Sequence, residues 1–194
     1  MKKIYILFIS LLVIGVSAGV FYLTVVRQSG VEVPDVMMET AYGEEYSFYN
    51  DSKDKVKLIE FIYTNCPDVC PTTTFRMTQL RDQFEKSGVF GKDIEFITIT
   101  IDPKRDSQAV LKQYADTFKI KSGSGWRLLR GSEEDTKAVA DSFGFMYRDP
   151  GNGFLIHSSY TYLLDDKNRL IEQFGMGEGF DKERVYKRIM RTID

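Results

Sequence analysis

The sequence predicts an α/β domain with a central mixed sheet flanked by helices, preceded by an N-terminal transmembrane helix. Two apolar runs, at residues 56–64 and 94–101, each precede a segment of helical periodicity, which indicates strands joined by helices and therefore parallel. Near the C-terminus, two strand-like segments flank a turn and a further helix follows, which adds an antiparallel pair to the sheet. A long uncharged run lies near the N-terminus, directly after Lys2 and Lys3.

The N-terminal run extends from Ile4 to Val26 without a charged residue. At about 1.5 Å per residue, a helix of this length reaches about 34 Å, enough to cross a hydrocarbon core of roughly 30 Å. Lys2 and Lys3 precede the run and favour a cytoplasmic N-terminus. The soluble domain is then expected on the extracytoplasmic side of a cell membrane.

Cleavage of this run as a signal peptide is the alternative, because Val16-Ser17-Ala18 resembles a cleavage site. The apolar sequence continues beyond that tripeptide, which favours an uncleaved, single-pass anchor over residues 1–28 and one domain over residues 29–194. No cysteine follows the run closely, which excludes lipid attachment there. No Arg- and Ser-rich targeting segment precedes it, so a bacterial envelope is the expected setting.

The composition is that of a globular protein, since 43% of the 194 residues are apolar and 28% are charged. The formal net charge is −2, and the anchor and its flanks hold basic residues but no acidic ones, so the domain is more acidic than the whole chain. The sequence has no basic stripe and no interleaving of basic and aromatic residues, which argues against a nucleic-acid partner.

The first half of the domain is expected to contain a tether, a hairpin, two buried strands and two helices. In chain order these are the tether 29–35, the hairpin 36–50, the strand 56–64, a helix that buries Met77, Leu80 and Phe84 and stops near Gly88, the strand 94–101, and a helix that buries Val110, Leu111, Tyr114 and Phe118.

The second half is expected to contain a short strand or turn, a helix, a loop, a hairpin and a last helix. In chain order these are residues 125–131, a helix opened by a capping box of Ser132 and Asp135, the loop 144–153, the hairpin strands 160–164 and 170–174, and a helix from about residue 181. Helix-linked parallel strands followed by an antiparallel hairpin and a packing helix are the arrangement of the thioredoxin-like fold.

Both cysteines lie in the sequence TNCPDVCP, directly after the first buried strand. Pro71 is expected to be the first helical residue, because proline restricts the residue before it and suits the start of a helix. Cys66 and Cys70 are then expected in the loop before the helix, where backbone N–H groups and the helix dipole favour a thiolate. A thiolate can attack a disulfide or bind a metal.

A structural disulfide is the alternative use of the two cysteines, because exported cysteines usually pair. A bridge between Cys66 and Cys70 would close a very short loop, which is the least useful length for stability. A redox-active pair and a metal site are the interpretations that remain.

The chain has one histidine, His157, which lies just before the C-terminal hairpin. A lone histidine is more often a surface residue than a ligand, but topology favours a role here. The C-terminal ends of two parallel strands share one edge of the sheet, and an antiparallel strand starts at that edge. We therefore expect His157 to face Cys66 and Cys70. Two thiolates and an imidazole suit copper best, with zinc as the alternative.

The sequence IDPKRDS leaves the second strand at the same edge. Asp102 and Asp106 flank Lys104 and Arg105, and one interpretation is a charged surface turn in which Asp106 or Ser107 caps the next helix. The other is that Asp102 and Asp106 support the metal ligands or help to dock a partner.

These motifs resemble the SCO family of cytochrome c oxidase assembly proteins. The matching pieces are YTNCPDVCP, IDPKRDS, GWRLLRG, the His157-Ser158 pair ahead of a tyrosine-rich strand, and the N-terminal anchor. The resemblance implies a thioredoxin-like fold that binds one copper ion, as Cu(I) or Cu(II), through Cys66, Cys70 and His157. It also implies delivery of copper or of reducing equivalents to the dinuclear copper centre of cytochrome c oxidase subunit II. The chain departs from the family at Ile62, where glycine is common, and at Ile156, where an acidic residue is common.

Three functions compete at this point. The first is a membrane-tethered copper chaperone, with oxidase subunit II, other copper carriers and thiol-disulfide oxidoreductases as expected partners. The second is a thiol-disulfide reductase that keeps the cysteines of subunit II or another exported target reduced; it needs no His157, and its usual pair is CxxC rather than the wider spacing found here. The third is a non-catalytic domain with a stabilising disulfide. A peroxidase is a weaker option.

Overall fold

The structure is a computed structural model, and it describes residues 2–22, 31–47 and 50–193. The chain divides into two compact units, residues 1–30 and 31–194. The expected boundary between residues 28 and 29 lies outside the described residues, as do the start of the expected tether and residues 48–49 of the expected first hairpin.

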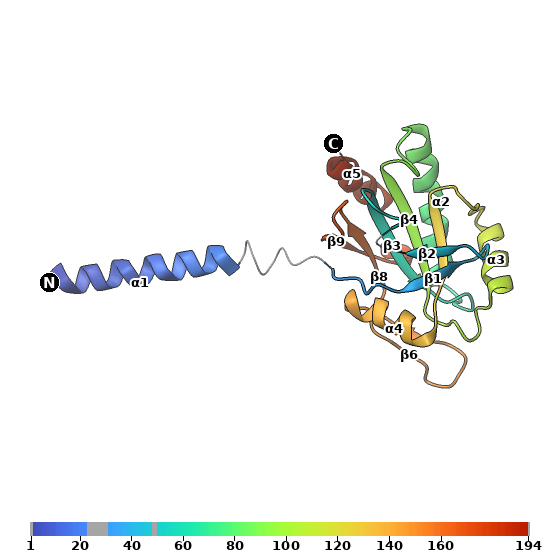
Figure 1. The fold of residues 1–194 in the computed structure, drawn as a ribbon, viewed down its shortest axis with the longest axis horizontal. Coiled ribbons are helices and arrows are strands. Elements are labelled where there is room, and N and C mark those ends of the chain that lie inside the picture. Colours follow the sequence, from blue (N-terminus) through green and yellow to red (C-terminus); the bar gives the residue numbers. More distant parts are fainter. Residues whose placement is uncertain (1, 23–30, 48–49, 194) are drawn as a thin grey trace. The chain divides into compact units, whose positions relative to one another are not determined.

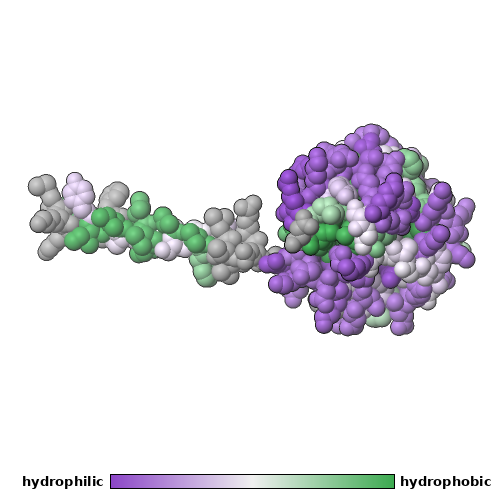
Figure 2. Space-filling model, turned by 90° about the horizontal axis from the view of Figure 1, so that it is seen from above, coloured by the Kyte–Doolittle hydropathy of each residue, from purple (hydrophilic) through white to green (hydrophobic). Residues whose placement is uncertain are grey.

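The first unit contains one long helix, α1 (Lys2–Phe21). Within it, Ile4–Phe21 is long and apolar enough to cross a membrane, and none of it is buried against other protein atoms. Figure 2 shows the apolar side chains along this helix in green. A helix that is apolar on all sides needs an apolar surrounding.

The second unit is built on a seven-stranded sheet in the order β2-β1-β5-β4-β3-β8-β9 (Figure 1). Strands β3, β4 and β5 are parallel to one another, and the remaining pairs are antiparallel, so the sheet is mixed as predicted. The strands are β1 (Met37–Thr40), β2 (Glu45–Ser47), β3 (Val56–Ile62), β4 (Ile94–Thr100), β5 (Trp126–Arg130), β8 (Tyr160–Leu164) and β9 (Leu170–Gly175).

Helices cover both faces of this sheet. They are α2 (Val69–Lys86), α3 (Gln108–Thr117), α4 (Glu133–Ser142) and α5 (Lys182–Ile193), with a 3-10 turn at η2 (Gly177–Gly179). Neighbouring residues of a strand point to opposite faces. Glu60 of β3 meets Thr74 of α2, whereas the ring of Phe61 lies 5.5 Å from that of Phe143 at the end of α4. Helices α2 and α4 therefore lie on opposite faces of the sheet.

The two central strands are buried along their whole length, as their continuous apolar pattern predicts. Their parallel register pairs Val56 with Ile94 and Ile62 with Thr100, so both strands end at the same edge of the sheet. Strand β8 runs antiparallel to β3, and it therefore starts near that edge. The chain segments that follow β3 and β4 and precede β8 are brought together there.

The helix caps follow the sequence signals. Ser107 caps α3 by accepting a hydrogen bond from the Val110 amide at 3.4 Å. Of the two predicted cap residues, Asp106 and Ser107, the cap is therefore Ser107. Ser132 caps α4 and accepts from the Asp135 amide at 3.0 Å, and its hydroxyl also bonds the Asp135 carboxylate. This is the expected capping pair, with a side chain-to-side chain bond in place of the usual return bond to the backbone.

The segment 125–131, expected as a short strand or a turn, contains strand β5, so the strand alternative is confirmed, and β5 extends the parallel sheet. Another element differs from expectation. The expected loop 144–153 contains β6 (Tyr147–Arg148), which pairs with β7 (Ile156–His157) in a separate small sheet. Strands of two residues carry no readable alternation, so sequence periodicity could not reveal them.

A polar network crosses the apolar core between β3, β4 and α2. The Glu60 carboxylate accepts hydrogen bonds from the hydroxyls of Thr74 (3.1 Å) and Thr98 (2.8 Å), and Thr98 in turn accepts from the Trp126 indole. Glu60 is fully buried, and its Oε2 has no hydrogen-bond partner among the described residues. Burial raises the pKa of Glu60 to about 7 against the opposing effect of the two threonine hydrogen bonds.

The raised pKa of Glu60 predicts a loss of stability with rising pH. The folded state holds an extra proton between pH 4.5, the ordinary value, and about 7, so the stabilisation is complete below the first value and is lost as pH rises through the second. Relative to Glu60→Gln, the free energy of unfolding should fall by about 3 kcal/mol across this window. Urea unfolding of the full chain in detergent micelles measures it.

The matched control for this titration is Glu134→Gln, because Glu134 is exposed. This variant removes one exposed carboxylate and measures the background effect of overall charge. A free-energy difference between wild type and Glu60→Gln that does not change with pH would show that Glu60 ionises in the folded protein as it does in water.

Candidate metal site

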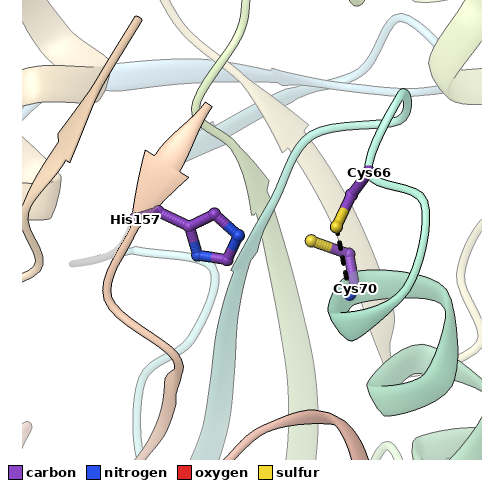
Figure 3. A group of neighbouring side chains, drawn as sticks. All are labelled: Cys66, Cys70 and His157. Carbon is purple, nitrogen blue, oxygen red and sulfur yellow. Dashed lines mark hydrogen bonds between the residues drawn. The ribbon is translucent and has the colours of Figure 1, made fainter. Parts of the chain in front are cut away.

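Three side chains converge at the edge where β3 ends and β7 lies (Figure 3). Cys66 follows β3, Cys70 lies in the first turn of α2, and His157 ends β7. Their ligand atoms all lie within 4.8 Å of one another. The expected proximity of His157 to both cysteines is therefore confirmed, and their role as metal ligands stays a prediction.

The donor set fits a soft metal ion. At the largest separation the centre of the triangle would lie about 2.8 Å from each donor, so bonds of roughly 2.3 Å to sulfur and 2.1 Å to nitrogen need only a small contraction. The two cysteines are not joined by a disulfide in this structure. Two sulfurs and one imidazole nitrogen match the preference of copper(I), and three donors leave a position through which another ligand can enter.

The loop that carries Cys66 is held by backbone and side-chain bonds. The Cys66 amide donates to the Tyr63 carbonyl at 3.1 Å, which closes a tight turn after β3. The Asn65 side chain donates to the Gly153 carbonyl at 3.2 Å and joins this loop to the segment before β7. The Cys70 amide, at the start of α2, points at the Cys66 sulfur at 3.4 Å. The helix start thus faces Cys66, as the dipole argument requires.

The expectation that Pro71 begins the helix is wrong. Helix α2 starts at Val69, so Cys70 lies inside the first turn rather than in the loop. The amides of a first turn have no acceptor within the helix, and proline therefore fits the third position as well as the first. The restriction on the residue before proline disfavours helical geometry without forbidding it.

The two thiols have opposite acidities. The hydrogen bond from the Cys70 thiol is the main cause that lowers the pKa of Cys66 to about 3, with further bonds from His157 and from the Asp68 and Cys70 amides outweighing the effect of burial. The same bond to Cys66, together with burial, raises the pKa of the Cys70 thiol. Cys66 is therefore a thiolate at neutral pH, and Cys70 keeps the proton that the pair shares.

The His157 ring is oriented by its own backbone neighbour. Its Nδ1 lies 2.7 Å from the Ser158 carbonyl oxygen, which can only accept, so Nδ1 carries a proton and Nε2 remains as the ligand atom. Burial lowers the pKa of His157, but hydrogen bonds to Cys66 and the Ser158 carbonyl outweigh it and leave the pKa raised. The ring also stacks on Phe145, with 5.9 Å between ring centres.

Asp106 holds the loop that precedes Cys66 in place through hydrogen bonds to Thr64. Its carboxylate accepts hydrogen bonds from the Thr64 amide (3.1 Å), the Thr64 hydroxyl (2.5 Å) and the Thr100 hydroxyl. It is nearly fully buried, and burial raises its pKa against the opposing effect of these bonds. Thr64 is two residues before Cys66, so Asp106 ties the loop to the end of β4.

Asp102 lies at the same edge but contacts a different group. Its carboxylate pairs with Arg105, which also bonds Asp149 at 3.1 Å, and its amide donates to the Thr100 hydroxyl oxygen at 3.0 Å. Neither Asp102 nor Asp106 belongs to the described group of possible metal ligands. A role for either residue in supporting the metal ligands or in docking a partner stays a prediction.

One residue beside the cluster, Tyr63, is not among the site residues predicted from the sequence. Tyr63 is buried beside the cluster, with its ring edge against the His157 ring at 5.8 Å between centres. Burial and the charge of Cys66 raise the pKa of Tyr63 to about 12, so its hydroxyl stays protonated. The signal that could have found it is its place as the first residue beyond a buried strand, where side chains line the sheet edge.

The low pKa of Cys66 predicts selective alkylation. At pH 6, iodoacetamide should modify Cys66 in preference to Cys70, because thiolates react and thiols do not. Thiolate absorbance near 240 nm should persist in acid to about pH 4. Peptide mass mapping identifies the labelled cysteine, and Cys66→Ser is the control. Labelling of Cys70 alone would reverse the assignment.

The contacts of Asp106 predict a large cost on its removal. Asp106→Ala leaves the Thr64 amide and the hydroxyls of Thr64 and Thr100 without their hydrogen-bond acceptor. We therefore expect a loss of about 3 kcal/mol in the free energy of unfolding. Asp102→Ala leaves a half-exposed Arg105 and should cost about 1 kcal/mol or less. Urea unfolding compares the two. Equal costs would deny Asp106 a special part in holding the loop.

Comparison with known proteins gives the chain a family. A family model described as SCO1/SenC matches residues 41–194. A SCO2-like protein of Rickettsia felis is 37% identical over 131 residues, which cover 64% of this chain and 60% of that protein. The SCO1 protein homolog of Bacillus subtilis is 26% identical over 172 residues, covering 82% of this chain and 86% of the homolog. The chain thus aligns with about 60% of the length of the Rickettsia protein.

Solved structures agree with the fold. A SCO1/SenC family lipoprotein from Bacillus anthracis has a TM-score of 0.76 at 27% identity, covering 86% of this chain and 98% of that chain. Yeast Sco1 with copper bound has a TM-score of 0.66 at 26% identity, covering 81% and 85%. BsSco, described as a member of the Sco family of cytochrome c oxidase assembly proteins, has a TM-score of 0.72 at 24% identity, covering 86% and 95%. The predicted thioredoxin-like fold is confirmed, and the chain belongs to the SCO1/SenC family.

Proposed function

We propose that the protein is a membrane-tethered copper-binding assembly factor that delivers copper to the dinuclear copper centre of cytochrome c oxidase subunit II. The observation that carries the proposal is the convergence of Cys66, Cys70 and His157 within 4.8 Å. Support comes from yeast Sco1, whose fold this chain shares and whose structure holds copper, and from BsSco, described as one of a family of oxidase assembly proteins.

Cys66 is the natural first ligand, because it is already ionised when the site is empty of metal. Cys70 then gives up its shared proton, and His157 offers Nε2 while Nδ1 stays bonded to the Ser158 carbonyl. Binding of one copper ion therefore releases protons and weakens in acid. The two sulfurs suit copper(I), and the nitrogen of His157 matters most for copper(II).

The oxidation state of the two cysteines gates this binding. When Cys66 and Cys70 each lose one electron to an external disulfide or other oxidant, their sulfurs join and neither remains a thiolate. The site then lacks two of its three donors. A reversible Cys66–Cys70 disulfide thus makes reduction a condition for metal loading, and thiol-disulfide oxidoreductases become partners alongside other copper carriers.

The proposed anchor tethers the metal-binding domain to a membrane. We propose that residues 1–28 remain as a single-pass anchor with a cytoplasmic N-terminus and that residues 29–194 work on the extracytoplasmic side. The length and apolar character of Ile4–Phe21 support this. A tethered carrier searches only the plane of the membrane, where a respiratory oxidase also resides.

A thiol-disulfide reductase is the second candidate, and the unequal acidity of the two cysteines favours it. An ionised Cys66 can attack a target disulfide, and Cys70 can then resolve the mixed disulfide and carry two electrons to the target. This chemistry does not need His157. The His157→Ala variant therefore separates the two candidates.

The copper proposal predicts the following loading behaviour. Reduced full-length protein in detergent micelles should bind one copper ion per chain, and Cys66→Ser or Cys70→Ser should abolish binding. His157→Ala should retain copper(I) and lose the sulfur-to-copper(II) charge-transfer band, because copper(II) depends more on nitrogen. Metal analysis and absorption spectra measure both, with Asp149→Asn as a surface control. Tight copper retention by either serine variant would remove the mechanism.

A further inference from the structure

Ser158 replaces one backbone hydrogen bond of the small β6–β7 sheet with a bond to its side chain. Met146 and Ser158 stand opposite each other, next to the Tyr147–His157 pair. The Ser158 amide donates to the Met146 carbonyl at 2.9 Å, and in a regular antiparallel ladder the Met146 amide would donate back to the Ser158 carbonyl. Here the Met146 amide donates instead to the Ser158 hydroxyl oxygen, at 3.1 Å.

The Ser158 carbonyl, which a regular ladder would use, bonds the histidine instead. Its oxygen lies 2.7 Å from Nδ1 of His157. Because a carbonyl oxygen can only accept, Nδ1 is the donor, and Nε2 remains for the metal. Figure 3 shows the His157 ring reaching from β7 toward the two cysteine sulfurs. Ser158 therefore bonds Met146 through its hydroxyl and His157 through its carbonyl.

The hydroxyl prevents a competition for this carbonyl. In a protein without the hydroxyl, the backbone acceptor that stands opposite the Met146 amide is the Ser158 carbonyl itself. Bonds of an antiparallel ladder run perpendicular to the strands, so the carbonyl would turn toward Met146 and away from the ring. The imidazole would then lose the acceptor that sets its orientation.

We propose that Ser158 is a positioning residue for the metal site, because its hydroxyl occupies the Met146 amide and thereby keeps its carbonyl for Nδ1 of His157. The inference rests on the proposed copper site. Ser158 acts through His157 and is not itself a ligand. Threonine is the substitution that keeps the same acceptor at the same place on the chain.

The first test needs no metal. His157 is the only histidine of the chain, so isotope-labelled histidine in the reduced full-length protein, held in detergent micelles, gives the magnetic resonance signals of one imidazole. In Ser158→Ala the Nδ1 proton should exchange with water about fivefold faster than in the wild type, the factor expected from one hydrogen bond. Ser158→Thr should match the wild type.

Two comparisons show that the hydroxyl is the cause. Ser158→Val and Ser158→Thr introduce side chains of the same shape, both suited to a strand, so the difference between them reports the hydroxyl even if Ser158→Ala fails to fold. Ser159→Ala is the matched control, because Ser159 is the next residue, is exposed and takes no part in the bonds between Met146, Ser158 and the ring. Its Nδ1 proton should exchange as in the wild type.

A backbone substitution tests the competition itself. Replacing Met146 with its α-hydroxy acid puts an ester oxygen in place of the amide N–H and so removes the competing donor. Combined with Ser158→Ala, this change should restore slow exchange of the Nδ1 proton. Exchange that stays fast in the combined variant would contradict the proposal, because the carbonyl would then not have been lost to Met146.

The second test adds copper alone to the same proteins. In Ser158→Ala and Ser158→Val the copper(II) dissociation constant should rise about tenfold, as is typical when a group bonded to a ligand is lost. The copper(I) dissociation constant should stay near the wild-type value, because the two sulfurs suit that ion. Ser158→Thr should restore copper(II) binding.

The outcomes separate this inference from the proposed function. Proton exchange and copper(II) binding that equal the wild type in both hydroxyl-free variants would overturn the role of Ser158 and leave the copper site standing. Faster exchange without weaker copper(II) binding would also overturn it. A protein whose ring responds as expected but that binds no copper would overturn the proposed function and leave the bond between Ser158 and the ring established.

Discussion

The pairing of β3 with its two neighbours is the constraint on which the site depends. Parallel pairing with β4 brings two strand ends to one edge, and antiparallel pairing with β8 starts a third strand there. The cysteine loop, the Asp102–Asp106 segment and His157 are distant in sequence and meet only for this reason. A one-residue slip of β3 would exchange Glu60 and Phe61 between the two faces, so the buried core protects the register and with it the site.

Much of the site could be predicted, because the topology of the sheet follows from long apolar runs and a hairpin that are clear in the sequence. The apolar runs of β3 and β4 and the final hairpin were sufficient to place His157 opposite the cysteines. The start of α2 could not be predicted as well, since proline suits several positions of a first turn. Strands β6 and β7 are too short for periodicity, and Glu60 lies inside an apolar run where a lone polar group gives no signal of its contacts.

The chain departs from the family pattern at Ile156 and Ile62, and only Ile156 lies next to a proposed ligand. Ile156 stands where an acidic residue is common, and here the imidazole is oriented instead by the Ser158 carbonyl, a neutral acceptor. A neutral partner adds less basicity to the ring than a carboxylate would. Ile62 stands where glycine is common, and it is fully buried in β3. The electrostatic character of the site therefore comes mainly from its own thiolate and imidazole.

The small sheet of β6 and β7 determines how firmly the fold holds His157 compared with the two cysteines. His157 sits on a strand of two residues, whereas Cys70 is fully buried in an 18-residue helix. Short two-stranded ribbons open at far lower free energy than packed helices. In a metal-loaded site, fraying of this ribbon would move the imidazole away while the two sulfurs stay in place. The nitrogen is therefore the donor that the fold holds least firmly.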